Sequence, residues 1–291
     1  MAKKKSKKHS WIGTVLLVLI LLAGVGLLVY PTFSDWWNTM HQSRAIAGYV
    51  ERISNADQEE IERLWEEAHA YNAELAKKGN RFKVSEEELE RYKTVLDVTG
   101  TGIMGYIDIP KIDVSLPIYH STSDEVLQIA VGHMEGTSLP VGGKGTHALL
   151  SGHTGLPSAK LFTNIDRLEE GDRFMINVLG RMLTYEVDQI QVVLPMEVED
   201  LDIDPEQDYV TLITCTPYGV NTHRLLVRGR RVEEDTEEQM VVPAEAVFLD
   251  KIVLGVVVGV PVLLFILIMT LIFTRKKKKH ARKGLTAEDE V

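Results

Sequence analysis

Two long uncharged apolar runs, one near each end of the chain, constrain this sequence more than any other feature. Trp11–Tyr30 contains no charged residue over 20 positions, and Ile252–Thr274 contains none over 23. A bilayer core of about 30 Å is crossed by about 20 helical residues, so both runs are long enough to span it. Lysines precede the first run and Lys/Arg residues follow the second, and such flanks favour the cytoplasmic side. The pattern predicts a two-pass protein of the cell membrane, with its middle outside the cell and both termini cytoplasmic.

The first apolar run also resembles the start of a signal peptide, which would be cleaved. Its apolar stretch is longer than the 7–15 residues typical of such peptides, and no A-x-A-like site follows it, so a retained anchor is favoured. The whole chain then divides into seven expected parts. These are a basic tip (1–10), a span (11–31), an outer helical region (32–97), a β domain (98–235), a linker (236–251), a second span (252–274) and a basic tail (275–291).

The middle of the chain is acidic and contains one cysteine. From Thr32 to Asp250, 19 Lys/Arg stand against 39 Asp/Glu, a net charge of about −20 that the overall −10 conceals. A solvated acidic surface explains this charge, and we expect no nucleic-acid partner. Cys215 is the single cysteine, so a hydrophobic core rather than disulfides must hold the domain together. An unpaired thiol of this kind is either an inert buried residue or a nucleophile.

Residues 41–96 are predicted to be helical. Apolar residues recur there mostly at three- and four-residue intervals, the period of one buried helix face. Asp57 with Glu60, and Ser85 with Glu88, resemble capping boxes at the starts of two helices. We expect these helices to form a stalk or a cover between the membrane and the β domain.

From Val98 onward the pattern changes to short β segments. Apolar or alternating runs are separated by Gly, Pro, Asp or Asn, the usual punctuation of strands. The predicted strands are 103–109, 112–118, 147–151, 173–178, 182–194, 209–214 and 224–232. At least seven strands in about 135 residues predict a mainly β domain, either a barrel or a sandwich.

Cys215 lies at the end of a predicted strand, and Arg224 begins the next one. The intervening TPYGVN (216–221) has the Pro, Gly and Asn of a loop. If the two strands pair as a hairpin, residues flanking the loop face each other about 5 Å apart. A guanidinium beside the thiol would favour thiolate and stabilise an anionic transition state. Arg224 can equally be a solvated edge residue, like the arginines that follow it.

A cysteine nucleophile also needs a proton acceptor and donor, for which histidine is the usual residue. The β domain offers five histidines: His120, His133, His147, His153 and His223. His153 lies in GHTG, a Gly-flanked turn at a strand end, where active sites tend to form. Spacing alone does not favour it over His133 or His223.

Four separated segments resemble one protein family in both order and spacing. They are TLITCTPYGVNTHRLLVRGRR (211–231), MGYIDIPKIDVSLPIYH (104–120), VGHMEGTSLPVGG (131–143) and LLSGHTGLPSAKLFTNID (149–166). All are similar to class C sortases, the pilin polymerases of Gram-positive bacteria, over about residues 98–235 plus the lead-in and anchors. The resemblance implies a mainly β fold, a sortase-type eight-stranded β-barrel with an N-terminal helical lead-in and two flanking transmembrane helices.

The same resemblance implies a set of residue roles and a reaction. Cys215 aligns with the nucleophile, His153 with the general acid/base and Arg224 with the oxyanion- or substrate-positioning arginine, and no metal or cofactor is required. The implied reaction is transpeptidation through a thioester, joining pilin subunits that carry an LPxTG-like sorting signal to a Lys amine. The alternatives are a housekeeping sortase that attaches surface proteins to cell-wall peptide, and an inactive scaffold for pilus assembly.

Two departures from the class C pattern concern the surroundings of the site. Class C members usually have a lid ahead of the barrel, with an Asp-Pro-aromatic motif whose Asp meets the catalytic Arg. The corresponding connector here, GNRFKV (79–84), has no Asp-Pro and contains one aromatic residue, Phe82. A lid over 79–85 would therefore depend on Phe82. Thr154 stands where relatives often have Arg, a change that we expect to be tolerated.

Overall fold

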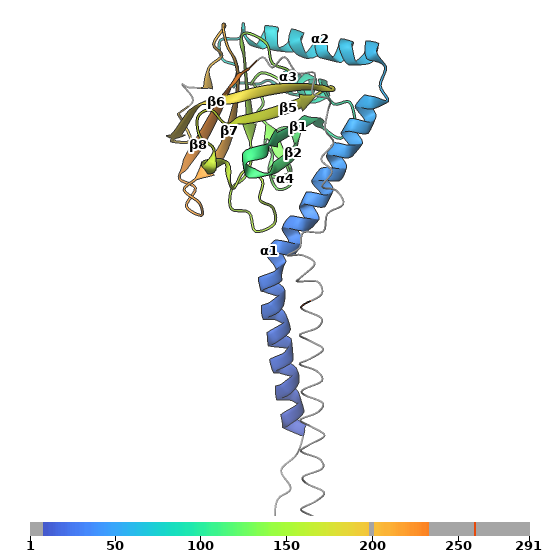
Figure 1. Ribbon diagram of the computed structural model, residues 1–291, viewed down its shortest axis with the longest axis vertical. Coiled ribbons are helices and arrows are strands. Elements are labelled where there is room, and N and C mark those ends of the chain that lie inside the picture. The colour runs from blue at the N-terminus through green and yellow to red at the C-terminus, as the bar shows by residue number, and fades with distance from the viewer. Residues whose placement is uncertain (1–7, 198–200, 233–258, 260–291) are drawn as a thin grey trace, which may run out of the picture. The chain divides into compact units, whose positions relative to one another are not determined.

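The β domain is a closed barrel of eight strands (Figure 1). The computed structural model describes residues 8–197, 201–232 and 259. The strands are β1 (Ile103–Ile109), β2 (Val114–His120), β3 (Val131–His133), β4 (Thr146–Ser151), β5 (Arg173–Val178), β6 (Arg181–Val193), β7 (Asp208–Thr216) and β8 (His223–Arg231). Their order around the barrel is β1-β2-β3-β4-β7-β8-β6-β5. The mainly β, eight-stranded barrel that the resemblance implies is confirmed.

The seven strands predicted from the sequence all form, with ends within two residues of the predicted bounds. The second strand begins later than predicted because Pro110–Ile112 forms a 3₁₀ turn ahead of it. The eighth strand, β3, was not predicted. It is three residues long, which is too short to show the alternation that marks a strand.

Alternation along the strands separates the barrel interior from an outer face. From β4, β7 and β8, the residues in the main core are Ala148, Leu150, Val210, Leu212, Leu225 and Val227. The intervening residues Leu149, Ile213 and Leu226 form a second buried cluster with Leu201, which precedes β7. Because successive side chains of a strand point to opposite faces, this second cluster lies on the outside of the barrel wall. The candidate site lies on this same face.

Three helices precede the barrel: α1 (Lys8–Ser54), α2 (Gln58–Leu75) and α3 (Glu86–Thr94). The predicted box at α3 is confirmed, since the N–H of Glu88 donates to Ser85 Oγ and the N–H of Ser85 donates to the Glu88 carboxylate. At α2 the helix follows Asp57 as predicted, but the Asp57 side chain makes no capping hydrogen bond. The predicted box there is wrong, because Glu60 pairs instead with Arg52 of α1 at 2.7 Å.

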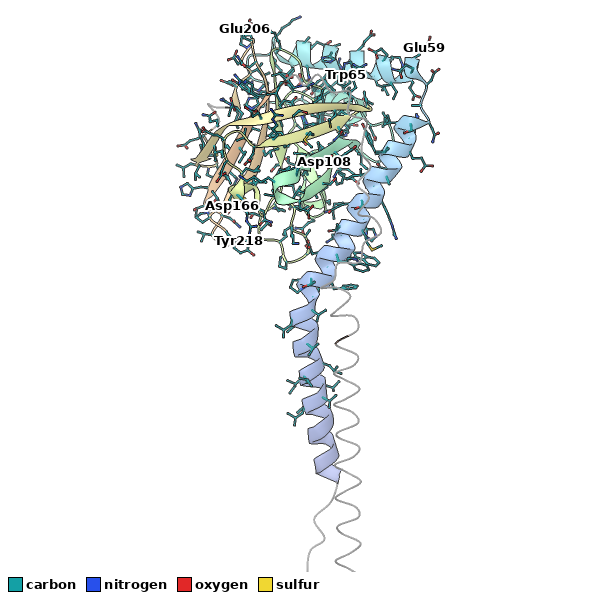
Figure 2. All side chains as sticks on the ribbon, in the orientation of Figure 1. Glu59, Trp65, Asp108, Asp166, Glu206 and Tyr218 are labelled. Carbon is teal, nitrogen blue, oxygen red and sulfur yellow. The ribbon has the colours of Figure 1, made fainter. Side chains whose placement is uncertain are left out.

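Helix α2 crosses one end of the barrel (Figure 1). Asn72 exchanges two hydrogen bonds with the backbone of Leu139, ahead of β4. The Arg181 guanidinium, at the start of β6, lies 4.3 Å from the centre of the Trp65 ring. The loop before β4 lies at this end, so the C-terminal ends of β4 and β7 lie at the other. Figure 2 labels Glu206 and Tyr218, which flank β7 at its two ends.

Helix α1 contains the first apolar run and continues through Pro31 without interruption. The described part of α1 belongs to two compact units, one that includes residues up to Phe33 and one that begins at Ser34 and contains the barrel. Within the described residues, α1 is the one helix long and apolar enough to cross a membrane, with a mean hydropathy of 2.4 over an 18-residue window. A signal sequence passes the same test. The helix supports membrane anchoring. The predicted second span (252–274), linker and basic tail lie outside the described residues.

Candidate active site

The hairpin of β7 and β8 brings Cys215 and Arg224 together. The two strands are antiparallel, and their register pairs Cys215 directly with Arg224 and Thr216 with His223. Side chains that are directly opposite in such a pair have Cβ atoms about 5 Å apart. The hairpin on which the predicted pairing depends is therefore present. The Cys215 side chain is half-buried and its sulfur is a free thiol.

A compact turn holds the register of this hairpin. The backbone N–H groups of Val220 and Asn221 both donate to the carbonyl of Pro217, at 3.0 and 2.9 Å. Gly219 and Asn221 have φ values of +76° and +60°, a left-handed conformation that these two residue types tolerate better than most. The sequence of the loop therefore suits a tight turn, after which Arg224 faces Cys215 across the hairpin.

His153 joins this pair through strand β4, which runs parallel to β7. Ser151 is in register with Ile213, and the N–H of Gly152 donates to the carbonyl of Ile213 at 3.0 Å. The Thr214 hydroxyl returns a 2.7 Å hydrogen bond to the carbonyl of Gly152. His153 and Cys215 each follow this registered pair by two residues. They therefore lie beside each other at the C-terminal ends of their strands, on the outer face.

Two of the other histidines are buried: His133 inside the barrel, and His147 on the outer face of the wall, since it alternates with Ala148 on β4. His133 is fully buried, with Nδ1 2.9 Å from the Tyr92 hydroxyl and Nε2 2.8 Å from the carbonyl oxygen of Ser138. His147 is also buried, and its Nε2 lies 2.7 Å from the Thr211 hydroxyl. Burial lowers the pKa of each imidazole to about 4, which keeps both rings neutral near pH 7. Both side chains are held in place inside the protein, away from the thiol.

The remaining histidines are separated from Cys215 by orientation. His120 is buried between the carbonyl oxygens of Gly102 and Val95. His223 is next to Arg224, but strand alternation directs it to the opposite face of β8. His153 is thus the histidine of the β domain that shares a face and a barrel end with Cys215. Among the described residues, no three His, Cys, Asp or Glu side chains gather as metal ligands would.

Two arginines of β8 have different electrostatic surroundings. Arg228 forms a two-point ion pair with Asp188, with both N···O distances at 2.9 Å. Arg224 donates instead to the backbone carbonyls of His223, at 3.1 Å, and Asn221, at 3.4 Å. Within the described part of the chain, Arg224 forms no ion pair with a carboxylate. Its positive charge is therefore available to an anion that develops beside the Cys215 sulfur.

The turn after Cys215 also packs against the loop after His153. Gly155 has a φ of +76°, and a Cβ added there would lie 3.0 Å from Cε2 of Tyr218. Tyr218 is 69% exposed, so its ring covers the Gly155 backbone while leaving most of its own surface in solvent. This contact was not predicted from the sequence. The sequence feature that could have indicated it is Tyr218, an aromatic residue in the turn that follows Cys215.

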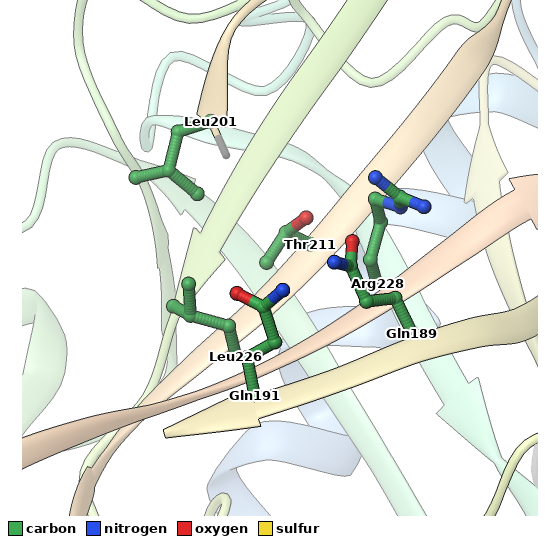
Figure 3. A pocket seen from close by; sticks show the side chains of 6 residues that line it. All are labelled: Gln189, Gln191, Leu201, Thr211, Leu226 and Arg228. Carbon is green, nitrogen blue, oxygen red and sulfur yellow. The ribbon is translucent and has the colours of Figure 1, made fainter. Parts of the chain in front are cut away.

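A shallow depression lies further along the same outer face (Figure 3). It is open to solvent, with about 200 Å³ of space between its walls, and it is lined by Gln189, Gln191, Leu201, Thr211, Leu226 and Arg228. Thr211 precedes Cys215 by four residues on β7, a separation of about 13 Å at 3.3 Å per residue. Apolar and polar side chains thus line a recess within reach of an extended peptide whose reacting bond lies at the thiol.

The connector between α2 and α3 reaches the edge of this depression. The Arg81 guanidinium donates to the carbonyl oxygen of Leu201. The Phe82 ring centre lies 4.7 Å from the guanidinium carbon of Arg81, and the Phe82 side chain is 39% exposed. The candidate lid residue is therefore placed beside the loop that holds Leu201, and its lid role stays a prediction.

Known proteins share both the barrel and its sequence. The sortase domain family matches residues 107–232. The crystal structure of sortase C1 from Streptococcus agalactiae is 48% identical, with a TM-score of 0.65 over 66% of this chain and 100% of that one. Sortase C from Clostridium perfringens, solved with the C-terminal cell wall sorting motif, is 45% identical with a TM-score of 0.57, over 66% and 99%. Sortase A of Streptococcus agalactiae serotype III (strain NEM316) is 26% identical over 78% of this chain and 88% of its own.

The barrel, the thiol at its edge and these similarities define an enzyme class, the cysteine transpeptidases. The chain belongs to the sortase family, and its similarity to solved sortase C structures places it in class C.

Proposed function

We propose that this enzyme polymerises pilins. It cleaves the Thr–Gly bond of an LPxTG-like sorting signal on one pilin subunit and joins the Thr carbonyl to a Lys amine of another. The observation that carries the proposal is the placement of Cys215 opposite Arg224, with His153 beside them on one face. The relatives add support, since the crystal structure of Streptococcus pneumoniae sortase C, which is 41% identical, provides insights into pilin substrate specificity.

The first half of the reaction forms a thioester. The Cys215 thiolate attacks the Thr carbonyl carbon, and the resulting oxyanion is stabilised by the Arg224 guanidinium. When this intermediate collapses, the C–N bond to Gly breaks and the His153 imidazolium gives its proton to the departing amine. The acyl group is then bound to sulfur, and His153 is neutral.

The second half transfers the acyl group to the acceptor. A Lys amine of the second pilin attacks the thioester carbonyl, and neutral His153 takes the proton that the amine loses. The C–S bond breaks, which restores the Cys215 thiolate and the His153 imidazolium. The product is an isopeptide bond, and the two halves together consume no cofactor and no oxidant.

The outer face of β7 and β8 suits the residues that precede the cleaved bond. The sorting signal extends from Cys215 toward the depression lined by Leu201, Leu226 and Thr211. The LPxTG leucine precedes its threonine by three residues, about 10 Å in an extended chain, so the leucine would reach the near side of this depression. The apolar side chains of Leu201 and Leu226 favour an apolar group of the signal over a charged one.

The membrane topology follows from the flanking charges. The basic residues before 11–31 and after 252–274 place both termini in the cytoplasm, and the catalytic barrel then lies outside the cell. The partners of the enzyme are the membrane and secreted pilin subunits, which reach the site on the outer surface.

The test is covalent polymer formation by the full-length enzyme with its pilin. Cys215→Ala and His153→Ala are expected to abolish the ladder of linked subunits on a denaturing gel. His223→Ala is the matched control, because His223 is next to Arg224 but faces the other side of β8, and its ladder is expected to persist. A ladder in the Cys215→Ala variant would refute the proposal. A labelled amine that enters from cell-wall peptide rather than from pilin Lys would instead indicate a housekeeping sortase.

A further inference from the structure

Two hydrogen bonds within the loop that carries His153 join its beginning to its end. The N–H of Phe162 donates to the carbonyl of His153 at 3.1 Å, and the N–H of Gly155 donates to the Thr163 hydroxyl at 3.1 Å. Between these bonds the chain has no regular secondary structure through residues 154–160. Irregular loops are more mobile than the strands they connect. The position of His153 therefore depends on what holds the far part of this loop.

Helix α1 supplies that contact. The Asn38 amide donates to the carbonyl of Ser158 at 2.8 Å, and the Lys160 backbone N–H donates to Asp35 Oδ1 at 2.9 Å. The other carboxylate oxygen of Asp35 lies 3.5 Å from the Lys160 ammonium, and the Asp35 side chain is 24% exposed. We call Asp35 and Asn38, with the backbone of 158–160, the helix clasp.

The spacing of the clasp residues shows a helix face directed at backbone groups of the barrel loops. Asp35 and Asn38 are three residues apart and so lie on one face of α1. One turn further on, Gln42 is buried and donates to the carbonyl of Ile129 at 2.7 Å. These side chains bind main-chain atoms of the loops, so the contacts do not depend on the identity of the loop side chains. The carboxylate bond of Asp35 is the strongest of this kind, because hydrogen bonds to ionised groups are about twice as strong as neutral ones.

We infer that α1 positions the catalytic histidine, and that Asp35 and Asn38 are positioning residues for His153. The inference rests on the proposed function, since it takes His153 to be the acid/base of the reaction. The contacts of 158–160 with α1 restrict the part of the loop that the loop's own hydrogen bonds do not hold. Proton transfer requires the imidazole within hydrogen-bond reach of the leaving amine. Asp35 follows Pro31, the end of the predicted span, by four residues, so the helix expected to anchor the enzyme also organises its active site.

Three variants of the full-length protein test the clasp by steady-state kinetics with a sorting-signal peptide and an amine acceptor. Asp35→Ala removes the acceptor of the Lys160 N–H and is expected to lower kcat by about tenfold with little change in KM, since a small misplacement of a catalytic group is costly. Asp35→Asn keeps an acceptor oxygen and is expected to restore kcat to within about threefold. Lys160→Ala keeps the backbone N–H and is the matched control, with near wild-type kcat expected.

An unchanged kcat in Asp35→Ala overturns the inference, as does an equal loss in Asp35→Ala and Asp35→Asn. Hydrogen exchange of the full-length chain gives a readout that does not depend on activity. The clasp predicts faster exchange at Lys160 and Phe162 in Asp35→Ala, with exchange in β5 unchanged. Unchanged exchange in this loop overturns the clasp even if the enzyme is active. A wild-type enzyme that does not process the peptide refutes the proposed function, while the exchange experiment still decides the clasp.

Discussion

For single residues, membership of the candidate site is decided by the face of the barrel wall on which a side chain lies. His223 is adjacent to Arg224 in sequence yet faces away from it, whereas His153 comes from another strand and shares its face. The same alternation puts Leu226 and Ile213 in the outer cluster. The candidate catalytic residues lie at the ends of β4 and β7, and the register of these strands sets their positions. We therefore expect small changes in the loops after these ends to lower activity more than they lower stability.

Gly155 allows a direct test of that expectation. Gly155→Ala would place a Cβ 3.0 Å from the Tyr218 ring at a φ of +76°, whereas Gly171→Ala would meet nothing within 4 Å at a φ of +92°. Both substitutions impose left-handed backbone strain of about 1 kcal/mol, which should lower Tm by similar amounts. Gly155→Ala alone should also lower kcat/KM, by about tenfold, because the His153 loop or the turn after Cys215 must move.

Thermal unfolding and peptide cleavage by the two purified variants measure these effects. Equal activity in Gly155→Ala and Gly171→Ala, at equal Tm, would show that the contact between Gly155 and Tyr218 has no catalytic role.

For helices and strands, the sequence predicts what is local and misses what is distant. Alternation locates seven strands, and the Ser85 box forms because its partners lie within one helical turn. The Asp57 box fails because Arg52, on the preceding helix, attracts Glu60. That Cys215 faces Arg224 could be predicted, because the two residues flank the short loop of a hairpin. That His153 joins them could not be predicted from the residues alone. Its place depends on the parallel pairing of β4 with β7, which no local pattern encodes.

The connector between α2 and α3 is another contact that local patterns do not show. Arg81 ties it to the carbonyl of Leu201 at the depression, and Phe82 projects from the same segment. The lid role predicted for Phe82 requires this connector to cover the approach to Cys215, and under that prediction Phe82→Ala should speed alkylation of the thiol severalfold by making the covered state less stable. The pseudo-first-order rate with iodoacetamide measures this. Lys83→Ala changes the same connector but keeps the aromatic ring, and should leave the rate unchanged.

A Phe82→Ala variant that is alkylated at the wild-type rate would leave Phe82 without a lid role. The connector would then serve to brace the Leu201 loop through Arg81, and Arg81→Met would be expected to weaken peptide binding instead.

At the scale of the whole molecule, helix α1 contains both the expected membrane span and residues that contact the barrel, which the sequence alone assigns to separate parts. The expected boundary between span and outer region falls at residue 31, yet α1 continues from Lys8 to Ser54 and contributes Asp35 and Asn38 to the barrel loops. The helix that contains the expected anchor therefore also carries the side chains that bind the barrel loops. Under the proposed function, secreted pilins can be joined only if the thiol lies outside the cell.

Because Cys215 is the single cysteine, thiol labelling can test on which side of the membrane the barrel and the two ends of the chain lie. A membrane-impermeant maleimide applied to intact cells should label Cys215 as fully as it does after lysis, because the proposed two-pass arrangement places the barrel outside. In a Cys215→Ala background, Ser6→Cys and Thr286→Cys report on the two ends of the chain, and both should react only after lysis. Labelling of Thr286→Cys in intact cells would show that residues 252–274 do not return the chain to the cytoplasm. Labelling of Cys215 only after lysis would place the thiol inside the cell, where it cannot join secreted pilins, and would overturn the proposed function.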